Sequence, residues 1–217
     1  PESQGSVLTL TGAASHQVVE HALEEGLLPE EDFNWSTGTI SGHPVRVRRN
    51  PHRLGVDGWD LTLNAEHVDE VRRALLNVGA TRVGQEAYEL CRVLAGVPRV
   101  PDDMGLANVP LEAQTLYDTI DWDKGCYIGQ EVIAMMHYRG RPNRHLRGLA
   151  FTGDGPPQGS AVMTAEGREV GRVGTVVSLP QGAGSVALAV IKRKHAEPDT
   201  VLSVNEQTAK VLALPLT

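Results

Sequence analysis

The first half of the chain alternates between strand-like and helix-like patterns of apolar residues. Short apolar runs or two-residue alternation predict four strands, at residues 7–10, 44–48, 59–63 and 80–83. Apolar residues at helical spacing predict two helices, one over residues 13–25 before Gly26 and one from the N-cap residue Asn64 to Gly79. The order strand, helix, strand, strand, helix, strand is the pattern of a ferredoxin-like β-α-β-β-α-β unit, which we expect over residues 6–83.

A third helix is predicted over residues 85–95, ahead of Gly96. Its apolar stripe comprises Ala87, Leu90, Cys91 and Leu94. Because free cysteine is among the most frequently buried residue types, we expect Cys91 to lie in the core. Residues 97–117 are rich in Pro, Asp and Asn, which predicts a long ordered loop.

Beyond Pro142 the pattern changes to short strands separated by turns. Six strands are predicted, at residues 146–151, 161–164, 169–178, 185–191, 200–204 and 210–214. Strands of this length and spacing favour a small antiparallel β-barrel. The chain is therefore expected to be α+β, with residues 1–142 as one domain and residues 143–217 as a C-terminal barrel.

Composition and charge argue for a folded globular protein and against some classes of nucleic-acid-binding protein. The chain has 217 residues, 41% hydrophobic and 22% charged, as a folded globular protein does, and its net charge of −7 argues against a surface that binds nucleic acid throughout. Residues 132–153 nevertheless lack an acidic residue, while their basic side chains are His137, Arg139, Arg141, Arg144, His145 and Arg147. This stretch fits a solvated connector and a contact surface for phosphate, polyglutamate or RNA equally well.

The cysteines and the apolar runs indicate the compartment. Cys91 and Cys126 are too few for a disulfide framework and too far apart for a CxxC motif, so a reducing compartment fits best. No apolar run is as long as a membrane span, and no signal peptide is evident. We expect a cytoplasmic protein that does not contact a membrane; the missing initiator Met indicates a fragment or a processed form.

Residues 124–131 (KGCYIGQE) do not resemble a core segment. Polar side chains and two glycines without periodic apolar partners predict a turn that holds a site. A thiol acts as nucleophile or metal ligand only as the thiolate, which Lys124 and the acid-free stretch downstream would favour at Cys126. Gln130 and Glu131 are expected to begin a helix. A small cysteine that merely fills space in a tight turn would explain the same spacing.

The same residues resemble the KGCYxGQE signature of the YgfZ family, within the aminomethyltransferase superfamily that includes the glycine cleavage T-protein. Every fixed position matches. Agreement continues at Arg92, Gly96, Pro98, Pro110, Glu112, Arg139, Gly140, Asn143, Arg144, Gly167, Glu169, Val170 and Gly171. The resemblance implies that a ferredoxin-like unit, a further α+β layer and a C-terminal barrel surround a folate pocket, and that part of the family's N-terminal region is absent from this chain.

The resemblance also implies the cofactor, tetrahydrofolate or a one-carbon derivative, and two residues that bind it. Related aminomethyltransferases hold the pteridine with a carboxylate in a glycine-containing turn, which corresponds here to residues 55–60 (GVDGWD). The carboxylate falls on Asp60, one methylene shorter than the usual glutamate. Arg92 would bind the carboxylates of the folate tail, since a guanidinium can do so bidentately. Without the resemblance, Asp60 is a polar-face strand residue and Arg92 a helix surface residue.

The signature segment supplies the remaining site residues implied by the resemblance. Cys126 and Lys124 are expected to be catalytic, with Cys126 near the one-carbon position of the folate. Tyr127, Gln130 and Glu131 are expected to contact the cofactor. No residue is expected to bind a metal ion.

The function that the resemblance implies is that of a tetrahydrofolate-binding accessory protein for iron-sulfur cluster assembly or repair, affecting tRNA-modifying and other cluster enzymes. Two cysteines cannot supply the four thiolates of an ordinary cluster, so cluster contact would be transient or shared. We expect a monomer whose partners are folate, iron-sulfur proteins or their assembly machinery, and tRNA in a weak contact. Whether it catalyses a folate-dependent, aminomethyltransferase-like transfer stays open. The alternatives are a glycine-cleavage aminomethyltransferase and a non-catalytic module that binds tRNA or protein.

Overall fold

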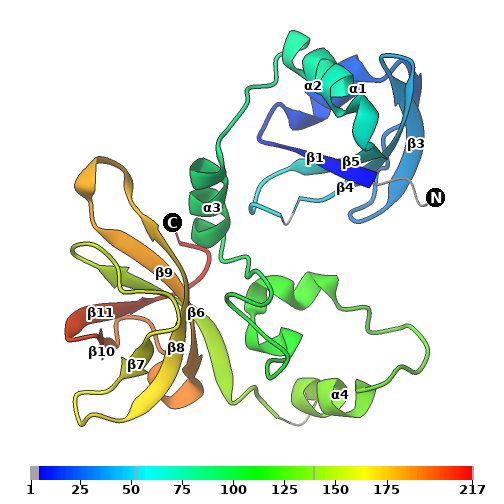
Figure 1. Ribbon diagram of the computed structural model, residues 1–217. Coiled ribbons are helices and arrows are strands. Elements are labelled where there is room, and N and C mark those ends of the chain that lie inside the picture. The colour runs from blue at the N-terminus through cyan, green and yellow to red at the C-terminus, as the bar shows by residue number, and fades with distance from the viewer. Residues whose placement is uncertain (1–4, 52, 139, 217) are drawn as a thin grey trace. The chain divides into compact units, whose positions relative to one another are not determined.

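The computed structural model describes residues 5–51, 53–138 and 140–216. The chain divides into two compact units, Pro1–Gln85 and Glu86–Thr217. Each unit has its own sheet system, and Figure 1 labels the elements of both. The sequence predicted a domain boundary after residue 142, and the barrel begins at Arg144. The compact units divide earlier, after Gln85, so the segment from Glu86 to the barrel belongs to the same unit as the barrel.

The first unit is a five-stranded antiparallel sheet in the order β1-β5-β4-β3-β2. Its strands are β1 (Gly5–Thr11), β2 (Glu25–Gly26), β3 (Trp35–Ile40), β4 (His43–Arg49) and β5 (Gly58–Asn64). Its helices are α1 (Ser15–Ala22), the short 3-10 helix η1 (Ala65–His67) and α2 (Val68–Asn77). The apolar residues of α1 and α2 pack with alternate residues of β4 and β5, including Val47 and Leu61, which are both fully buried.

Two expectations for this unit are wrong. Residues 80–83 form no strand: only Ala80 packs against the core, whereas residues 81–83 are exposed, Val83 by 64%. The helix predicted over residues 13–25 ends at Ala22, and Gly26 belongs to β2 instead of capping it. A Cβ at Gly26, whose φ is +106°, would overlap the backbone of β3, so this glycine permits the close approach of two strands. The unit therefore keeps the ferredoxin-like order β1-α1-β4-β5-α2, lacks the last strand, and has β2 and β3 added between α1 and β4.

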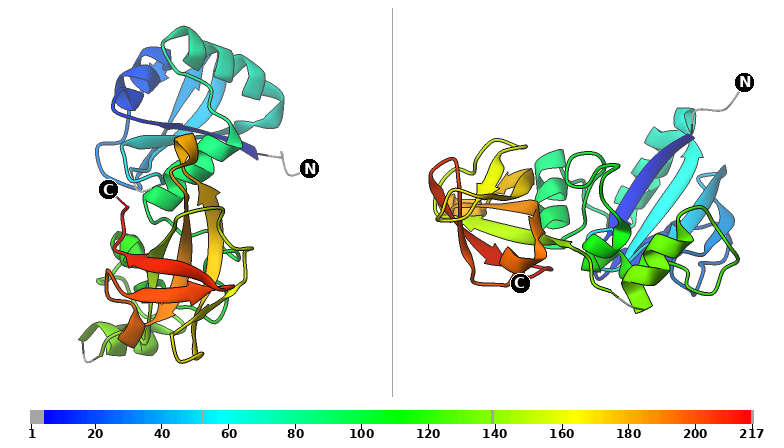
Figure 2. Two further views of the ribbon diagram at one scale, coloured as in Figure 1. Left: turned by 90° about the vertical axis from the view of Figure 1, so that its left-hand side faces the viewer. Right: turned by 90° about the horizontal axis from the view of Figure 1, so that it is seen from below.

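The second unit begins with α3 (Gln85–Leu94) and ends in a closed barrel (Figures 1 and 2). Between them lie η2 (Pro110–Glu112), η3 (Gln114–Thr119) and α4 (Gln130–Tyr138). The barrel strands, in the order β10-β11-β6-β9-β8-β7, are β6 (Arg144–Phe151), β7 (Ala161–Met163), β8 (Glu169–Ser178), β9 (Ser185–Lys192), β10 (Val201–Val204) and β11 (Gln207–Leu212). All six strands were predicted, so both the α+β class and the antiparallel barrel are confirmed.

Two apolar clusters stabilise this unit. One fills the barrel and includes Leu149, Val162 and Val211, all fully buried. The other lies where α3 and the following loop pack on the barrel, and it includes Val93, Leu146 and Leu188. Buried apolar area of this kind is the main favourable contribution to folding, at about 25 cal/mol per Å².

The buried face of α3 differs from the expected one. Arg92 and Val93 are the buried residues of α3, whereas Cys91 is exposed. The prediction that Cys91 belongs to the core is therefore wrong, and so is the alternative that Arg92 lies on the helix surface. Gly96 ends the helix as expected: its φ is +71°, and the N–H of Val97 donates to the carbonyl of Arg92, as in a Schellman motif.

None of the helices among the described residues has the length and apolar character needed to cross a bilayer.

Candidate functional site

The signature segment, residues 124–131, follows a turn built on Asp121. Its Oδ1 accepts hydrogen bonds from the N–H groups of Asp123 (3.0 Å) and Lys124 (3.1 Å). At the other end, Gly129 has a φ of +91°, which favours glycine, and Gln130 begins α4. The prediction that Gln130 and Glu131 start a helix is confirmed. The segment is thus a loop fixed at one end by an Asp turn and at the other by a helix N-terminus.

Aromatic side chains hold this loop against its own helix. The ring of Trp122 stacks on His137 of α4, with centroids 4.0 Å apart and an interplanar angle of 25°. Tyr117 lies 6.4 Å from Trp122 in a tilted arrangement. Lys124 Nζ lies 4.6 Å from the ring centroid of Tyr127, a cation–π contact within the signature itself. The chain therefore folds back from the Asp turn onto α4. In the sequence, Cys126 lies between Lys124 and Tyr127, the two residues of the cation–π contact.

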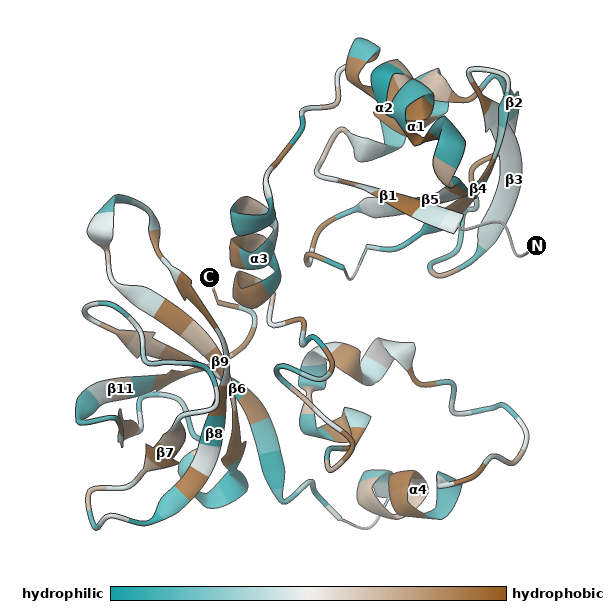
Figure 3. Ribbon diagram, in the orientation of Figure 1, coloured by the Kyte–Doolittle hydropathy of each residue, from teal (hydrophilic) through white to brown (hydrophobic). Residues whose placement is uncertain are grey.

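Cys126 is exposed, as expected for a reactive thiol and not for a cysteine that fills space. The neighbouring Ile128 is fully exposed as well. Val132 and Met135 of α4, which lie three residues apart and so share one side of the helix, are also exposed. Figure 3 shows the hydrophobic middle of α4. The thiol is therefore exposed and not sealed inside packed hydrocarbon.

Asp60 is buried on β5, with only 5% exposure, and not on a solvated strand face. Its Oδ1 accepts from Thr9 Oγ1 (2.9 Å), and its Oδ2 accepts from Asn50 Nδ2 (2.7 Å) and Arg53 Nη2 (2.5 Å). Burial alone would raise the pKa of Asp60, but these hydrogen bonds and the charge of Arg53 outweigh it and hold the pKa below its ordinary value. Asp60 is therefore an ionised carboxylate on the sheet, with three of about four acceptor positions used.

Arg92 lies in a buried ion-pair network on the barrel. Its guanidinium pairs with Glu89 and Asp103, both at 2.7 Å, and donates to Thr175 Oγ1 (2.8 Å) of β8 and to the carbonyl of Val97 (2.6 Å). Burial alone would lower the pKa of Arg92, but the two carboxylates outweigh it and raise the pKa. With Nε also donating to Glu89, all five N–H groups are used. A folate carboxylate would have to displace one of these partners.

Asp103 is the centre of this network, and sequence reasoning missed it. Its side chain is fully buried; it accepts from the N–H of Thr175 (2.5 Å) and the N–H of Arg99 (2.8 Å) in addition to Arg92. A Cβ at Gly174 would overlap Asp103 Oδ1, so glycine is needed at that point of β8. Asp103 and Gly174 are far apart in sequence, and no local pattern pairs them. The network joins α3, the following loop and the barrel.

Five of the seven predicted site residues lie together in one loop and helix start: Lys124, Cys126, Tyr127, Gln130 and Glu131. Arg92 lies in the same unit but at the packing surface between α3 and β8. Asp60 belongs to the other unit.

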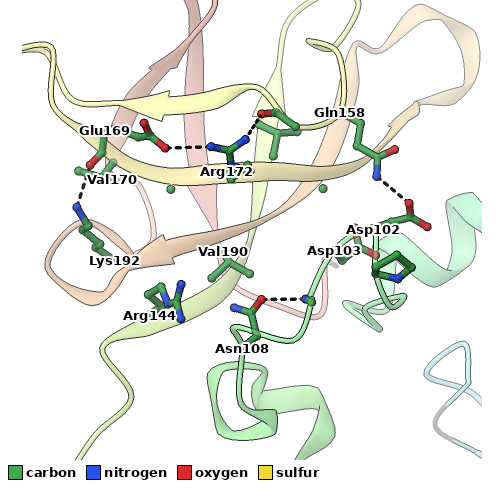
Figure 4. A pocket seen from close by; sticks show the side chains of 16 residues that line it. Asp102, Asp103, Asn108, Arg144, Gln158, Glu169, Val170, Arg172, Val190 and Lys192 are labelled. Carbon is green, nitrogen blue, oxygen red and sulfur yellow. Dashed lines mark hydrogen bonds and ion pairs between the residues drawn. The ribbon is translucent and has the colours of Figure 1, made fainter.

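A polar cleft of about 600 Å³ lies between β8, β9 and the loop that carries Asp102 (Figure 4). Several of its polar groups are hydrogen-bonded within the protein: Gln158 Nε2 donates to Asp102, and Lys192 Nζ donates to the backbone carbonyl of Glu169. None of the predicted site residues lines it. This cleft is therefore separate from the signature loop.

A second cleft, of about 620 Å³, is bordered by Met136 of α4 and is lined by several basic side chains. Its basic residues are Arg144, Lys192, Arg193 and Lys194. Arg144 pairs with the buried Glu112 (3.0 Å), which explains why the family resemblance includes both. Lys192 ends β9, Arg193 and Lys194 follow it, and all three lie outside the basic stretch singled out in the sequence.

Several basic side chains of residues 132–153 make contacts within the protein. Arg144 pairs with Glu112, Arg147 donates to a backbone carbonyl (2.7 Å), and His137 stacks on Trp122. Arg139 lies outside the described residues. The cationic surface is therefore centred on the second cleft more than on the stretch itself.

Comparison with known families and proteins agrees with this architecture. Residues 144–215 match the family described as the CAF17 C-terminal β-barrel domain. An aminomethyltransferase of Herpetosiphon aurantiacus is 31% identical over 182 residues, which is 82% of this chain and 50% of that protein. A chloroplastic protein of Arabidopsis thaliana, named as a transferase, is 26% identical over 97% of this chain and 48% of its own length.

The fold also matches a solved structure. The crystal structure of the glycine cleavage system aminomethyltransferase T from Bartonella henselae superposes with a TM-score of 0.73 at 20% identity, covering 99% of this chain and 60% of that one. The chain spans about half the length of the first curated relatives it matches. Residues 144–215 thus match a CAF17-type C-terminal β-barrel, and the chain is similar in sequence to aminomethyltransferases over most of its length.

Proposed function

We propose that this protein binds tetrahydrofolate, or a one-carbon derivative of it, and supports iron-sulfur cluster assembly or repair through the thiol of Cys126. The observation that carries the proposal is the exposed thiol in a loop that is fixed at both ends and stacked on α4. A reactive cysteine must be accessible, and a fixed loop presents it in one place. The resemblance of the signature to the YgfZ family supports the folate and cluster-maintenance parts of the proposal.

The thiol suits a transient exchange better than a permanent cluster. An ordinary cluster requires four thiolates, and this chain has two cysteines, Cys91 and Cys126, on different elements. Exposed apolar side chains follow Cys126 in the sequence, Ile128 in the loop and Val132 and Met135 on α4, and they suit contact with a client or assembly protein during such an exchange. Cys126 and Lys124 are the residues to which we assign the chemistry, in a cytoplasmic protein.

We assign a pterin contact to Asp60 of the first unit. Asp60 is ionised and held rigidly by Thr9, Asn50 and Arg53, so it could accept a hydrogen bond from a pterin N–H with its remaining lone pair. Arg92 is not part of this proposal, because its five donors are used by the protein.

Calorimetric titration of the full-length protein with tetrahydrofolate tests this assignment. We expect binding by the wild type and at least a tenfold loss of affinity, about 1.4 kcal/mol, in Asp60→Asn. Asp57→Asn, an exposed aspartate in the same turn, is the matched control and should bind as the wild type does. Absence of wild-type binding, or equal affinities of the two variants, would contradict the folate assignment.

A glycine-cleavage aminomethyltransferase is the second candidate, because curated relatives from several bacteria carry that name. Such an enzyme transfers a one-carbon unit from an aminomethylated carrier protein to tetrahydrofolate. An assay with that carrier protein separates the two functions. We expect no turnover; turnover that survives Cys126→Ser would instead favour the transferase.

The second cleft favours an additional contact with a polyanion such as tRNA. Lys192, Arg193 and Lys194 line it together with Arg144, against one carboxylate from Glu112. Phosphate contacts release counterions, so affinity for tRNA should fall steeply with salt. Arg193→Ala with Lys194→Ala should weaken binding and reduce its salt dependence, whereas salt-independent or absent binding would exclude this contact.

A further inference from the structure

Three potential metal ligands converge in the first unit, away from the signature loop. His43, His67 and Glu70 each offer one ligand atom, and these atoms lie within 4.8 Å of one another. Two imidazoles and one carboxylate form a donor set that suits borderline divalent transition ions, Zn²⁺ above all. Neither the proposed folate site nor the proposed thiol chemistry uses any of them.

The fold fixes these residues from two directions. His43 is the first residue of β4, directly after the two-residue turn Ser41-Gly42 whose φ values are +52° and +73°. Positive φ at both positions is typical of a type I′ turn, which ties His43 to Ile40 in a tight hairpin. His67 ends η1 and is the N-cap of α2, and Glu70 lies three residues further on in the first turn of α2, which brings both to one side of the helix start. The cluster therefore bridges the β3–β4 hairpin and the N-terminus of α2.

The present contacts show that the three side chains already interact. Nε2 of His43 contacts Oε2 of Glu70 directly. The rings of His43 and His67 are stacked, with centroids 3.9 Å apart and an interplanar angle of 10°. The side chains of His43, His67 and Glu70 are 23%, 30% and 51% exposed, so an ion can reach them from solvent.

A second carboxylate is placed to orient one of the imidazoles. Nε2 of His67 lies 3.3 Å from Oε1 of Glu66, and Glu66 in turn accepts from Asn64 Nδ2 at 2.6 Å. If His67 binds an ion through Nδ1, its Nε2–H can donate to Glu66. Carboxylates commonly support metal-bound histidines in this way.

We propose that His43, His67 and Glu70 bind one divalent transition ion, with Zn²⁺ as the reference, and that water completes the coordination. Zn–N bonds of about 2.0–2.1 Å require both imidazole lone pairs to point at one centre. The two rings must therefore turn out of their parallel stack, a rotation about a soft terminal torsion. The bound ion clips the β3–β4 hairpin to α2 and stabilises the first unit. This inference does not depend on the proposed function.

The test uses the full chain, stripped of metal with a chelator, in a background with Cys91→Ser and Cys126→Ser so that thiols do not bind the ion. Calorimetric titration with ZnCl2 should show one site per chain. His43→Ala and Glu70→Gln should each weaken it by at least about tenfold, as loss of a supporting group alone typically costs 10–100-fold. Glu70→Gln is nearly isosteric, so the fold should be preserved.

His21→Ala is the matched control, since His21 is an exposed histidine of the same unit on α1. It should bind Zn²⁺ with wild-type affinity. Zn²⁺ should also raise the thermal midpoint of the wild type and of His21→Ala, but not that of Glu70→Gln. Ring proton resonances of His43 and His67 should shift together on titration. The proposal is overturned if no site of this stoichiometry is found, or if His43→Ala and Glu70→Gln bind as His21→Ala does.

Discussion

Replacement of Asp103 by alanine tests the buried network on the barrel most severely. The carboxylate is fully buried and accepts from Arg92 and from the N–H groups of Arg99 and Thr175. Its removal leaves a buried guanidinium with one carboxylate, that of Glu89, where it had two. Breaking a buried ion pair by removing one partner costs about 3–5 kcal/mol. The N–H groups of Arg99 and Thr175 would also lose their acceptor. Each would add about 1–3 kcal/mol to the destabilisation if water did not reach it.

Unfolding in urea, followed by a signal from the barrel unit, measures this change. We expect a loss of about 4 kcal/mol for Asp103→Ala, which is a large part of the roughly 5–15 kcal/mol of a typical domain. Asp102→Ala is the control: this adjacent carboxylate pairs with Arg99 and Gln158 at the surface, and its loss should leave the transition nearly unchanged. Equal effects of the two substitutions would refute the assignment of Asp103 as the centre of the network.

Two further predictions concern packing and pH. Gly174→Ala should destabilise the barrel unit by about 1–3 kcal/mol, because the new Cβ would overlap Asp103. Gly105→Ala is the control, since Gly105 has open space around it and the substitution should be tolerated. Equal urea midpoints of the two variants would contradict the predicted overlap. The lowered pKa of Asp60 means that its contribution to stability is complete above its unfolded value of 3.8 and is lost as the pH falls through the folded pKa. The difference in unfolding free energy between wild type and Asp60→Asn should therefore shrink below about pH 4, and a constant difference down to pH 2 would contradict the shift.

The barrel could be predicted from the sequence because its signals are local. The strands combine apolar residues with flanking turn residues, and interior residues alternate along them, as Leu202 and Val204 do on β10 and Ala209 and Val211 on β11. The start of α4 after Gly129 was also predictable, because a glycine followed by the polar residues Gln130 and Glu131 is a local signal. The structure gives this glycine a positive φ. The strand β3 escaped prediction, since its sequence WSTGTI carries few apolar residues and only Ile40 is fully buried.

The face of α3 was mispredicted because the decisive partners are remote in sequence. Periodicity favoured burial of Cys91, but Arg92 is buried instead, and its partners Asp103 and Thr175 come from a loop and a barrel strand. A buried charge is stabilised only by such partners, and sequence spacing cannot identify them. Asp60 shows the same effect, since its burial depends on donors from two other segments, Thr9 and Asn50.

The signature loop was predicted as a unit because its residues are contiguous, whereas its anchoring was not. The stack of Trp122 on His137 joins residues fifteen positions apart, and it determines how the loop lies on α4. The expected partners, the monomeric state and the cytoplasmic location remain predictions.

Cell-based complementation with paired cysteine variants tests the central claim most directly. Both thiols are exposed, so Cys91→Ser serves as a control of the same chemistry for Cys126→Ser. In cells that lack this protein, the activity of an iron-sulfur enzyme that modifies tRNA should be restored by the wild type and by Cys91→Ser, but not by Cys126→Ser at equal protein level. Full restoration by Cys126→Ser would contradict the claim that this thiol performs the function.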